Sequence, residues 1–339
     1  MPQSIVLNLV TQSAIPREHL QGYVLQQLFF NLVKTVDPQL GNALCRDEQN
    51  RAYSLSALQL NEPSDASGNL YLLKEEKTTH LEQTQQAPKQ VKKGALQQPA
   101  KALQIAPQTL HLQYGHDQPI APNTACWWRI SFLDDGLFDH LIFLWNQLQN
   151  ECFPLGSGRV MIHSIAADLP SNGLTTGIPQ QDWASSCSYR DIYEQASAGD
   201  RNIHFQFITP TVFEQAGRIT ALPTVEAVFQ TLRRRWNCYS GLAFAPRLID
   251  NIFPTYFNIQ TQLTQIFRRS LSEPITGCLG HISFRITDDS DALIIQRLNT
   301  LADFTRYCPV GCNTQLGMGV IHRLSSLNAL NSQPLQSVK

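Results

Sequence analysis

The sequence predicts an α+β fold of two tandem ferredoxin-like domains, each with the βαββαβ element order of RRM domains, and a C-terminal glycine-rich loop. Three observations support this prediction. Strand-like and helix-like hydrophobic patterns alternate along the chain, the same order recurs in both halves, and residues 308–323 carry three glycines before a final apolar strand. The 339 residues are enough for two domains with separate cores.

The first half, residues 1–169, is predicted to be the N-terminal ferredoxin-like domain. It opens with a strand at residues 4–11 and a helix from Pro16 to about Lys34. The apolar stripe of this helix consists of Leu20, Val24, Leu28 and Leu32. The remaining expected elements are strands at residues 53–60, 127–133 and 159–166, and a helix carrying Leu137, Leu141, Leu144 and Leu148.

A polar insertion interrupts this domain at residues 61–123. The segment has ten glutamines, six lysines and several prolines, but neither Phe nor Trp. Such a composition buries too little apolar surface to offset the entropy of ordering the chain, so the insertion is predicted to be largely disordered. Residues 109–114 are the exception, because their pattern predicts an ordered edge strand.

The second half follows a Gly-, Ser- and Pro-containing connector at residues 170–200. The C-terminal domain, residues 201–326, is predicted to contain the glycine-rich loop 308–319, and residues 327–339 are expected to be a flexible tail. Its expected elements are a strand at 203–209, a helix at 225–236, a less regular stretch to about Glu273, a strand from Cys278, a helix ending at Tyr307 and a strand from Met318.

Composition limits the possible functions. The formal net charge is −1, so a protein that coats long nucleic acids is not indicated, yet the cations outside the insertion are almost all arginine, which suits phosphates and guanine edges. Eight cysteines form no C-x-x-C pair, and Cys308 and Cys312 alone are a weak metal motif, so no metal or cofactor is predicted. No run of eighteen apolar residues and no signal sequence are present, so no membrane partner and an intracellular location are expected.

Six segments together resemble a known family. Besides the loop at 308–323 they are Tyr-Ser-Leu-Ser-Ala-Leu (53–58), Trp-Arg-Ile-Ser-Phe-Leu (128–133), Phe-Ile-Thr-Pro-Thr-Val-Phe (207–213), Leu-Arg-Arg-Arg-Trp-Asn (232–237) and Leu-Ala-Asp-Phe (301–304). In order and spacing the chain resembles the RAMP superfamily, specifically the CRISPR-associated endoribonucleases that cut precursor CRISPR RNA within its repeats. The resemblance implies a cytoplasmic prokaryotic protein whose partner is CRISPR repeat RNA, with other subunits of a CRISPR effector complex as further partners.

The predicted RNA contacts are arginines and residues of the glycine-rich loop: Arg233, Arg234, Arg235, Arg268, Arg269, Gly311, Asn313, Gly317 and Gly319. Glycines allow positive φ and bring several N–H groups close to a phosphate, and arginine binds phosphate through a planar fork. Each set also has a structural interpretation. The glycines suit ordinary turns, the first three arginines suit the negative end of a helix dipole, and the other two suit a solvated surface.

The resemblance implies metal-independent cleavage by 2′-hydroxyl attack, which leaves 2′,3′-cyclic phosphate and 5′-hydroxyl ends, with a histidine on or just after the first helix as the usual base. This chain instead has Leu44-Cys45-Arg46 after that helix. Elimination among the nine histidines leaves His19 as an acid–base candidate. Tyr23, one turn later, lies where the resemblance implies an active histidine or tyrosine, and is the second candidate. The cationic helper would be an arginine, Arg51 or Arg46 being nearest in sequence, and Arg51 is the one we choose. The alternatives are a capping or exposed histidine and a packed tyrosine.

Three hypotheses therefore follow from the sequence. The leading one is a CRISPR repeat endoribonuclease. The second is a repeat-binding subunit of the same fold that does not cleave, which the absence of histidine at Cys45 favours. The third is a module that binds small molecules or proteins, in which the glycine-rich loop is only structural.

Overall fold

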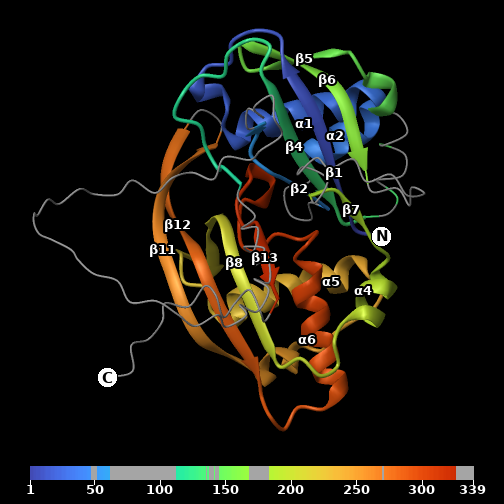
Figure 1. The fold of residues 1–339 in the computed structure, drawn as a ribbon, viewed down its shortest axis with the longest axis vertical. Helices are drawn as coiled ribbons and strands as arrows, with labels where there is room; N and C mark the ends of the chain where they lie inside the picture. The colour runs from blue at the N-terminus through green and yellow to red at the C-terminus, as the bar shows by residue number, and fades with distance from the viewer. Residues whose placement is uncertain are drawn as a thin grey trace, which may run out of the picture. The chain divides into compact units, whose positions relative to one another are not determined.

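A computed structural model of the protein describes residues 1–46, 52–61, 112–134, 136, 141, 145–167, 183–268 and 271–325, with the backbone alone described at 46, 267, 268, 271 and 272. It confirms the predicted α+β class. In the described residues the strands form a seven-stranded sheet, a four-stranded sheet and a two-stranded sheet, and every pairing is antiparallel (Figure 1).

The N-terminal sheet has the strand order β2-β4-β1-β6-β5, with β3 and β7 pairing beside this path on β4 and β1. Its strands are β1 (Gln3–Thr11), β2 (Tyr53–Leu55), β3 (Gln59–Leu60), β4 (Ala125–Phe132), β5 (Cys152–Leu155), β6 (Gly158–Ala167) and β7 (Ser185–Ser186). The first and third long strands of the βαββαβ unit, β1 and β4, are therefore neighbours at the centre. This is the ferredoxin-like arrangement that the sequence predicts.

The helices of this half cover one face of the sheet. They are the 3-10 turn η1 (Arg17–His19), α1 (Gly22–Val36), α2 (Pro38–Arg46) and the 3-10 turn η2 (Asn146–Leu148). Leu25, Leu28, Phe29 and Leu32 of α1 are buried in the core formed with β1 and β4. The predicted helix from Pro16 begins later than expected, because residues after Pro16 form a 3-10 turn and α1 starts only at Gly22. The predicted helix through Leu137 and Leu144 lies largely outside the described residues, although Leu141 and Leu148 are buried.

The C-terminal sheet has the order β11-β12-β8-β13, again the ferredoxin-like order. Its strands are β8 (Asn202–Thr211), β11 (Ile252–Arg268), β12 (Leu271–Ile286) and β13 (Ile321–Leu324), and β9 (Phe213–Gln215) pairs with β10 (Arg218–Thr220). The helices of this half are the π-turn η4 (Glu226–Gln230), α5 (Thr231–Tyr239), the 3-10 turn η5 (Pro246–Asn251), α6 (Ala292–Phe304) and the 3-10 turn η6 (Thr314–Leu316). Helices α5 and α6 supply Leu232, Trp236, Leu298 and Phe304 to the core on one face.

The stretch before Glu273, which we expected to be less regular, is instead a long hairpin. Strands β11 and β12 pair from Ile252 with Ile286 to Arg268 with Leu271. Most of its outer strand is exposed on both faces, with Phe253 43% and Leu263 71% exposed, so the short alternation of Phe257, Ile259 and Leu263 with polar residues does not mark a buried face.

The predicted connector also contains structure that the sequence analysis missed. Strand β7 pairs with the start of β1, and helix α4 (Tyr189–Gln195) begins after Ser188, whose hydroxyl accepts a hydrogen bond from the Asp191 amide. Most of the predicted insertion, residues 62–111, and the predicted tail lie outside the described residues. Residues 112–114 are described and are not a strand. They contact β3 through the Gln59 side chain, which bonds to the Gln113 backbone.

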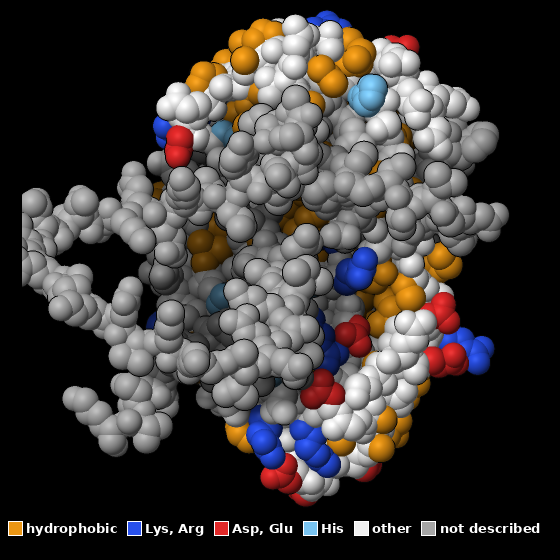
Figure 2. Space-filling view, in the orientation of Figure 1, with side chains coloured by type: hydrophobic (Ala, Val, Ile, Leu, Met, Phe, Trp, Pro, Cys, Tyr) orange, Lys and Arg blue, Asp and Glu red, His pale blue; other side chains and the backbone are white. Residues whose placement is uncertain are grey.

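Among the described residues, no helix has both the length and the apolar character needed to cross a membrane. Figure 2 shows Lys, Arg, Asp and Glu side chains gathered together on the visible face of the C-terminal half, where α4, α6 and β13 lie. In the same view, few Lys, Arg, Asp or Glu side chains are seen on the described part of the N-terminal half.

Candidate functional site

The start of helix α1 lies directly against the glycine-rich loop. A Cβ atom on Gly22 would lie 2.2 Å from the Leu316 carbonyl oxygen, so only glycine permits this approach of the two backbones. The N-cap Gln21 makes no side-chain capping bond, and the first turn of α1 holds no acidic residue. The positive end of the helix dipole is therefore presented beside the loop, as an anion site requires.

Tyr23 is the second residue of α1 and lies on the outside of this junction. Its side chain is 38% exposed, whereas the following stripe of Leu25, Leu28 and Phe29 is buried. The alternative that Tyr23 is a packed core residue is therefore not supported, and its phenol is accessible to a substrate.

His19 lies in the 3-10 turn before α1 and is held by the turn that joins β5 to β6. Its Nδ1 atom lies 3.1 Å from the Ser157 amide nitrogen and 3.0 Å from the Ser157 hydroxyl. Neutral imidazole accepts from the amide, and protonated imidazole donates to the hydroxyl, so Ser157 orients the ring in either state. Nε2 is consequently the nitrogen available to a ligand.

The ring of His19 also needs glycine beneath it. Gly156 has φ +61°, and a Cβ atom there would be 2.3 Å from His19 Cγ. The β5–β6 turn is thus shaped to receive the imidazole, which fixes its plane. The sequence Gly156-Ser157-Gly158 is typical of a turn, but nothing in it shows that His19 lies against this turn.

The glycine-rich loop has the positive φ values that the sequence predicts, at Gly311, Asn313, Gly317 and Gly319. The reason differs from the expected one. Cβ atoms on Gly311 and Gly319 would lie 2.2 Å from the Val212 oxygen and 2.0 Å from the Val310 oxygen. These conformations are therefore accounted for by close backbone packing within the chain, and contact of the four residues with RNA stays a prediction.

The loop's N–H groups are also partly used within the chain. The amides of Cys312 and Gly319 donate to the carbonyl oxygens of Val212 and Pro210, over 2.7 and 3.2 Å. Gly317 faces the other half of the molecule, with the Ala57 nitrogen 3.0 Å from the position of an added Cβ. The loop accordingly joins β8 to the segment after β2, and fewer of its amides face outward than the sequence analysis expected.

The three arginines of α5 have three different environments. Arg235 reaches the glycine-rich loop, where Nη2 donates to Thr314 Oγ1 over 3.0 Å and Nη1 lies 3.9 Å from Cys308 Sγ. Arg233 donates to the Phe244 carbonyl over 3.0 Å and so closes the loop after α5. Arg234 is exposed. One arginine of the three faces the loop, as the spacing predicts, and only Arg234 is fully available to a ligand from solvent.

Burial raises the pKa of the Cys308 thiol, and the nearby Arg235 and Arg234 guanidinium groups partly oppose this shift. No cluster of three or more potential metal ligands occurs in the described part of the chain.

The end of the β11–β12 hairpin also approaches the loop. Ile266 of β11 packs in a small apolar cluster with Leu316 and Met318 of the loop and with Val212. Tyr114 packs on the same cluster, and burial raises its pKa to about 12, opposed by a hydrogen bond with Thr264. The backbone of Arg268 therefore lies two residues beyond the loop contact.

Two predicted groups are not placed by the structure. Arg51 and Arg269 lie outside the described residues, and of Arg268 only the backbone is described. Cys45, at the position where the resemblance expects histidine, is exposed near the end of α2. The described residues thus bring together Tyr23, the start of α1, the glycine-rich loop and the hairpin end. We call this arrangement the α1–loop site.

Two family models match most of the chain. Residues 1–96 and 75–194 match the family model described as "CRISPR Cas6 N-terminal domain", and residues 205–321 match "CRISPR-associated endoribonuclease Cas6". A search of curated protein sequences gives no match.

Solved structures share the fold over nearly the whole chain. A Cas6 product complex has a TM-score of 0.63 at 19% identity, covering 96% of this chain and 100% of the other. A second Cas6 product complex gives 0.59 at 17% identity over 96% and 99%. A Thermus thermophilus Cas6 structure gives 0.57 at 18% identity over 96% and 98%. At these identities the structures establish the two ferredoxin-like domains and nothing finer.

Proposed function

The chain belongs to the CRISPR-associated Cas6 endoribonuclease family, and we propose that it binds CRISPR repeat RNA and cleaves precursor crRNA within each repeat at the α1–loop site. The observation that carries this proposal is the contact of Gly22 with Leu316, which presents an uncapped helix N-terminus and the exposed Tyr23 beside the glycine-rich loop. Similar folds in Cas6 product complexes support the binding of RNA.

The reaction that we propose is transesterification. The ribose 2′-hydroxyl loses its proton and its oxygen attacks the adjacent phosphorus, the bond from phosphorus to the 5′-oxygen breaks, and that oxygen takes up a proton. The products are a 2′,3′-cyclic phosphate and a 5′-hydroxyl. An acid, a base and donors for the phosphorane oxygens are sufficient for this chemistry, so no metal is required in principle.

His19 and Tyr23 are proposed as the acid–base pair. Nε2 of His19 is available because Ser157 binds Nδ1, and the amide and hydroxyl of Ser157 accommodate both protonation states of the ring. Tyr23 supplies an exposed hydroxyl at the start of α1. The amides at the first turn of α1 would stabilise the developing charge on phosphorus, a role that the sequence also suggests for Arg51.

Variants at these two positions test the assignment. His19→Ala and Tyr23→Phe should each lower the single-turnover cleavage rate of repeat RNA by about 100-fold or more, since acid–base groups contribute about 10²–10⁴-fold. Both should bind the repeat with an affinity close to that of the unchanged protein. Unchanged cleavage in both variants would contradict the assignment of these residues.

A non-cleaving repeat-binding protein is the second candidate function. The observation that favours it is the exposed Cys45 near the end of α2, because the resemblance expects histidine there. At neutral pH an ordinary thiol is mostly protonated, so a smaller fraction of it can accept a proton than of an ordinary imidazole. This alternative predicts that repeat RNA is bound tightly and remains uncut with the unchanged protein.

A further inference from the structure

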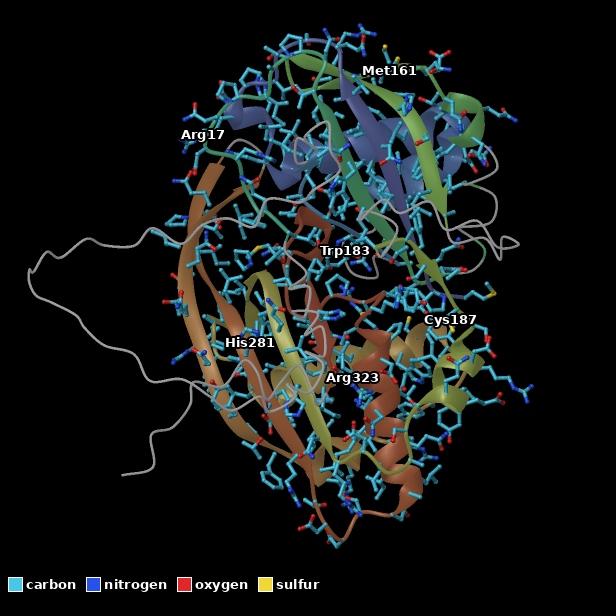
Figure 3. The ribbon with its side chains drawn as sticks, viewed as in Figure 1. Arg17, Met161, Trp183, Cys187, His281 and Arg323 are labelled. Carbon is cyan, nitrogen blue, oxygen red and sulfur yellow. The ribbon has the colours of Figure 1, made fainter. Side chains whose placement is uncertain are left out.

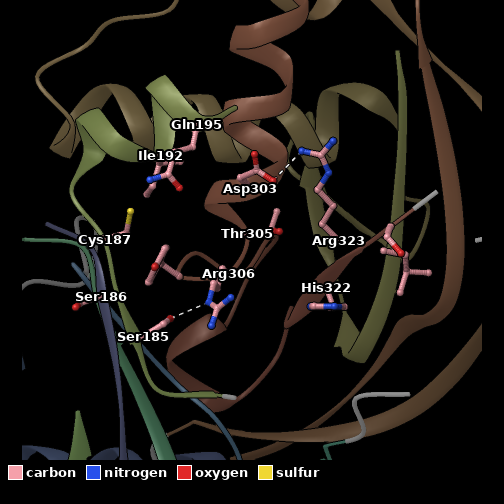
Figure 4. Close-up of a pocket in the computed structure, with 13 residues that line it drawn as sticks. Ser185, Ser186, Cys187, Ile192, Gln195, Asp303, Thr305, Arg306, His322 and Arg323 are labelled. Atoms are coloured by element: carbon pink, nitrogen blue, oxygen red, sulfur yellow. Dashed lines mark hydrogen bonds and ion pairs between the residues drawn. The ribbon is translucent and has the colours of Figure 1, made fainter. Parts of the chain in front are cut away.

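Arginine side chains join separate segments of this chain. Beside a cavity of about 510 Å³, Arg306 Nε donates to Ser185 Oγ of β7 over 3.0 Å, and Arg323 Nη1 donates to Asp303 of α6 over 2.7 Å (Figure 4). Arg323 lies on β13, the strand that follows the glycine-rich loop (Figure 3). Arg129 of β4, which is 5% exposed, donates to the Arg306 carbonyl oxygen and so links the two halves. Each of these guanidinium groups fixes one segment against another.

Arg235 of α5 makes a link of the same kind to the glycine-rich loop. Its Nη2 atom donates to Thr314 Oγ1 over 3.0 Å, and Thr314 is only 1% exposed. The Arg235 side chain is half-buried, and no ion pair between described residues includes it. Its guanidinium therefore serves either the loop or a bound phosphate, and these two roles predict different results.

Thr314 is the first residue of η6, the short turn in the middle of the loop. A 3-10 turn of three residues has little stability of its own, and η6 is flanked by Asn313 and Gly317, both with positive φ. Backbone hydrogen bonds at Cys312 and Gly319 hold the two ends of the loop, and η6 lies between them. Contacts with other elements must therefore set the position of η6.

The same turn carries the loop's contacts with the N-terminal half. A Cβ atom on Gly22 would lie 2.2 Å from the Leu316 carbonyl oxygen, and one on Gly317 would lie 3.0 Å from the Ala57 nitrogen. At such close approach, a shift of η6 makes the backbones separate or collide. The position of η6 on the C-terminal half is thus passed on to the first turn of α1.

We propose that Arg235 is a positioning residue, which holds η6 through Thr314 and so keeps the start of α1 beside the loop, and that it does not contact the RNA. This inference rests on the proposed function, because the position of α1 affects cleavage only if the α1–loop site performs it. It differs from the sequence prediction, which places Arg235 among the RNA contacts. A displacement of about 1 Å at an active site can lower the rate about 100-fold, so the link is relevant to catalysis.

Single-turnover cleavage and fluorescence anisotropy with repeat RNA and the full chain distinguish the two roles. Arg235→Gln removes the charge and shortens the side chain, and should lower the cleavage rate at saturating protein at least about tenfold. The affinity for the repeat should stay within about twofold, and the slope of log affinity against log salt should not change. Loss of a phosphate contact would instead weaken binding and reduce that slope by about 0.7–0.9.

Thr314→Val tests the same link without a change of charge, and keeps the proposal testable if Arg235→Gln does not fold. Valine has the shape of threonine but no hydroxyl to accept from Arg235. The cleavage rate should fall by a similar factor with unchanged affinity. The double variant should be no slower than Arg235→Gln alone, because the two residues act through one contact.

Two control variants match these changes away from the link. Thr231→Val removes a hydroxyl from the same helix, where Thr231 Oγ1 donates to the Ala227 carbonyl oxygen one turn earlier. Arg190→Gln removes a charge from α4, where Arg190 is 81% exposed and pairs with Glu194. Both variants should keep the rate and the affinity within about twofold.

Hydrogen exchange in the RNA-free protein tests the position of the loop independently of cleavage. Peptides covering residues 20–26 and 312–319 should exchange faster in Arg235→Gln and Thr314→Val. Unchanged exchange in both variants would overturn the inference. If the unchanged protein cuts the repeat, but both variants keep its rate or Arg235→Gln loses affinity and salt dependence, the inference is wrong and the proposed function stands. If the unchanged protein leaves the repeat whole, the proposed function is wrong and the inference falls with it.

Discussion

The two sheets share one strand order but differ in what covers their second faces. In the N-terminal sheet, the residues of β1 and β4 that point away from α1 are buried as well, including Val6, Trp127 and Arg129. Val6 and Trp127 pack in a cluster that also takes Ile208 and Val320 from the C-terminal half. In the C-terminal sheet the corresponding face carries half-buried His204, Gln206 and His281.

This difference shows how one fold, used twice, can serve two purposes. A sheet buried on both faces is a scaffold, and it holds α1 against the glycine-rich loop. A sheet with one polar face retains a surface on which a ligand can lie. Four predictions test this comparison, from the largest expected effect to the smallest.

Trp127→Ala should cause the largest loss of stability. Trp127 is 7% exposed and its ring centre lies 6.4 Å from that of Trp183, so truncation leaves a cavity between the halves. We expect a loss of about 3–5 kcal/mol in the free energy of unfolding, measured by urea denaturation. Gln206→Ala, on the polar face of the C-terminal sheet, should lower the free energy of unfolding by less than about 1 kcal/mol. Equal losses would contradict the comparison.

Gly22→Ala should separate α1 from the glycine-rich loop. At a helical position alanine is normally more favourable than glycine by about 1 kcal/mol, but here its Cβ would lie 2.2 Å from the Leu316 oxygen. We therefore expect a net loss of about 1–3 kcal/mol and a cleavage rate at least about tenfold lower. The matched control is Gly199→Ala, because nothing lies within 4 Å of an added Cβ there. A stable variant with normal cleavage would show that the junction does not form the active site.

Ser157→Ala should lower the cleavage rate by about five- to tenfold and leave repeat binding unchanged. The protonated ring of His19 would lose its hydroxyl acceptor, while the backbone amide of residue 157 would still orient the neutral ring. Ser13→Ala removes a hydroxyl from the same neighbourhood, where Ser13 accepts from the Arg159 amide, and should have no effect on the rate. Both rates would be measured by single-turnover kinetics. A slower rate in Ser157→Ala alone would indicate orientation of His19, whereas equal losses in both variants would indicate a general effect on the β5–β6 hairpin.

The free energy of unfolding should depend on pH through the histidines on the polar face of the C-terminal sheet. Burial lowers the pKa of His204, His281 and His322, and Arg306 and Arg129 lower that of His322 further. The unfolded chain then binds more protons than the folded one just below pH 6.5, so the free energy of unfolding falls as the pH drops through this region. His281→Gln should make this fall shallower in urea titrations from pH 7 to pH 5. The same slope as in the unchanged protein would show that His281 is not buried on this face.

The elements with a regular apolar pattern could be predicted from the sequence. The strand at residues 4–11 and the helices of residues 225–236 and 292–304 show apolar residues at the period of their structure, and the structure contains β1, α5 and α6 there. The β11–β12 hairpin was not predicted, although Phe257, Ile259 and Leu263 alternate with polar residues in its outer strand. The alternation is short, and most of this strand is exposed on both faces, so its apolar residues do not mark a core.

The candidate sites were predictable only in part. The glycine-rich loop was singled out by its residue types and Tyr23 by its position in the family resemblance, and their roles toward RNA stay predictions. The contact of His19 with Ser157 joins residues 138 positions apart, and that of Arg129 with Arg306 joins residues 177 apart. Such contacts depend on tertiary packing, within the N-terminal half for His19 and between the halves for Arg129, and leave no local pattern.

Cleavage of repeat RNA in EDTA, with the end groups of the products mapped, tests the central claim most directly. The account predicts one pair of products, with a 2′,3′-cyclic phosphate on the upstream fragment and a 5′-hydroxyl on the downstream fragment. Repeat RNA that stays bound and whole would contradict it and would make the protein a binding subunit, and products ending in 3′-hydroxyl would contradict the proposed 2′-hydroxyl attack.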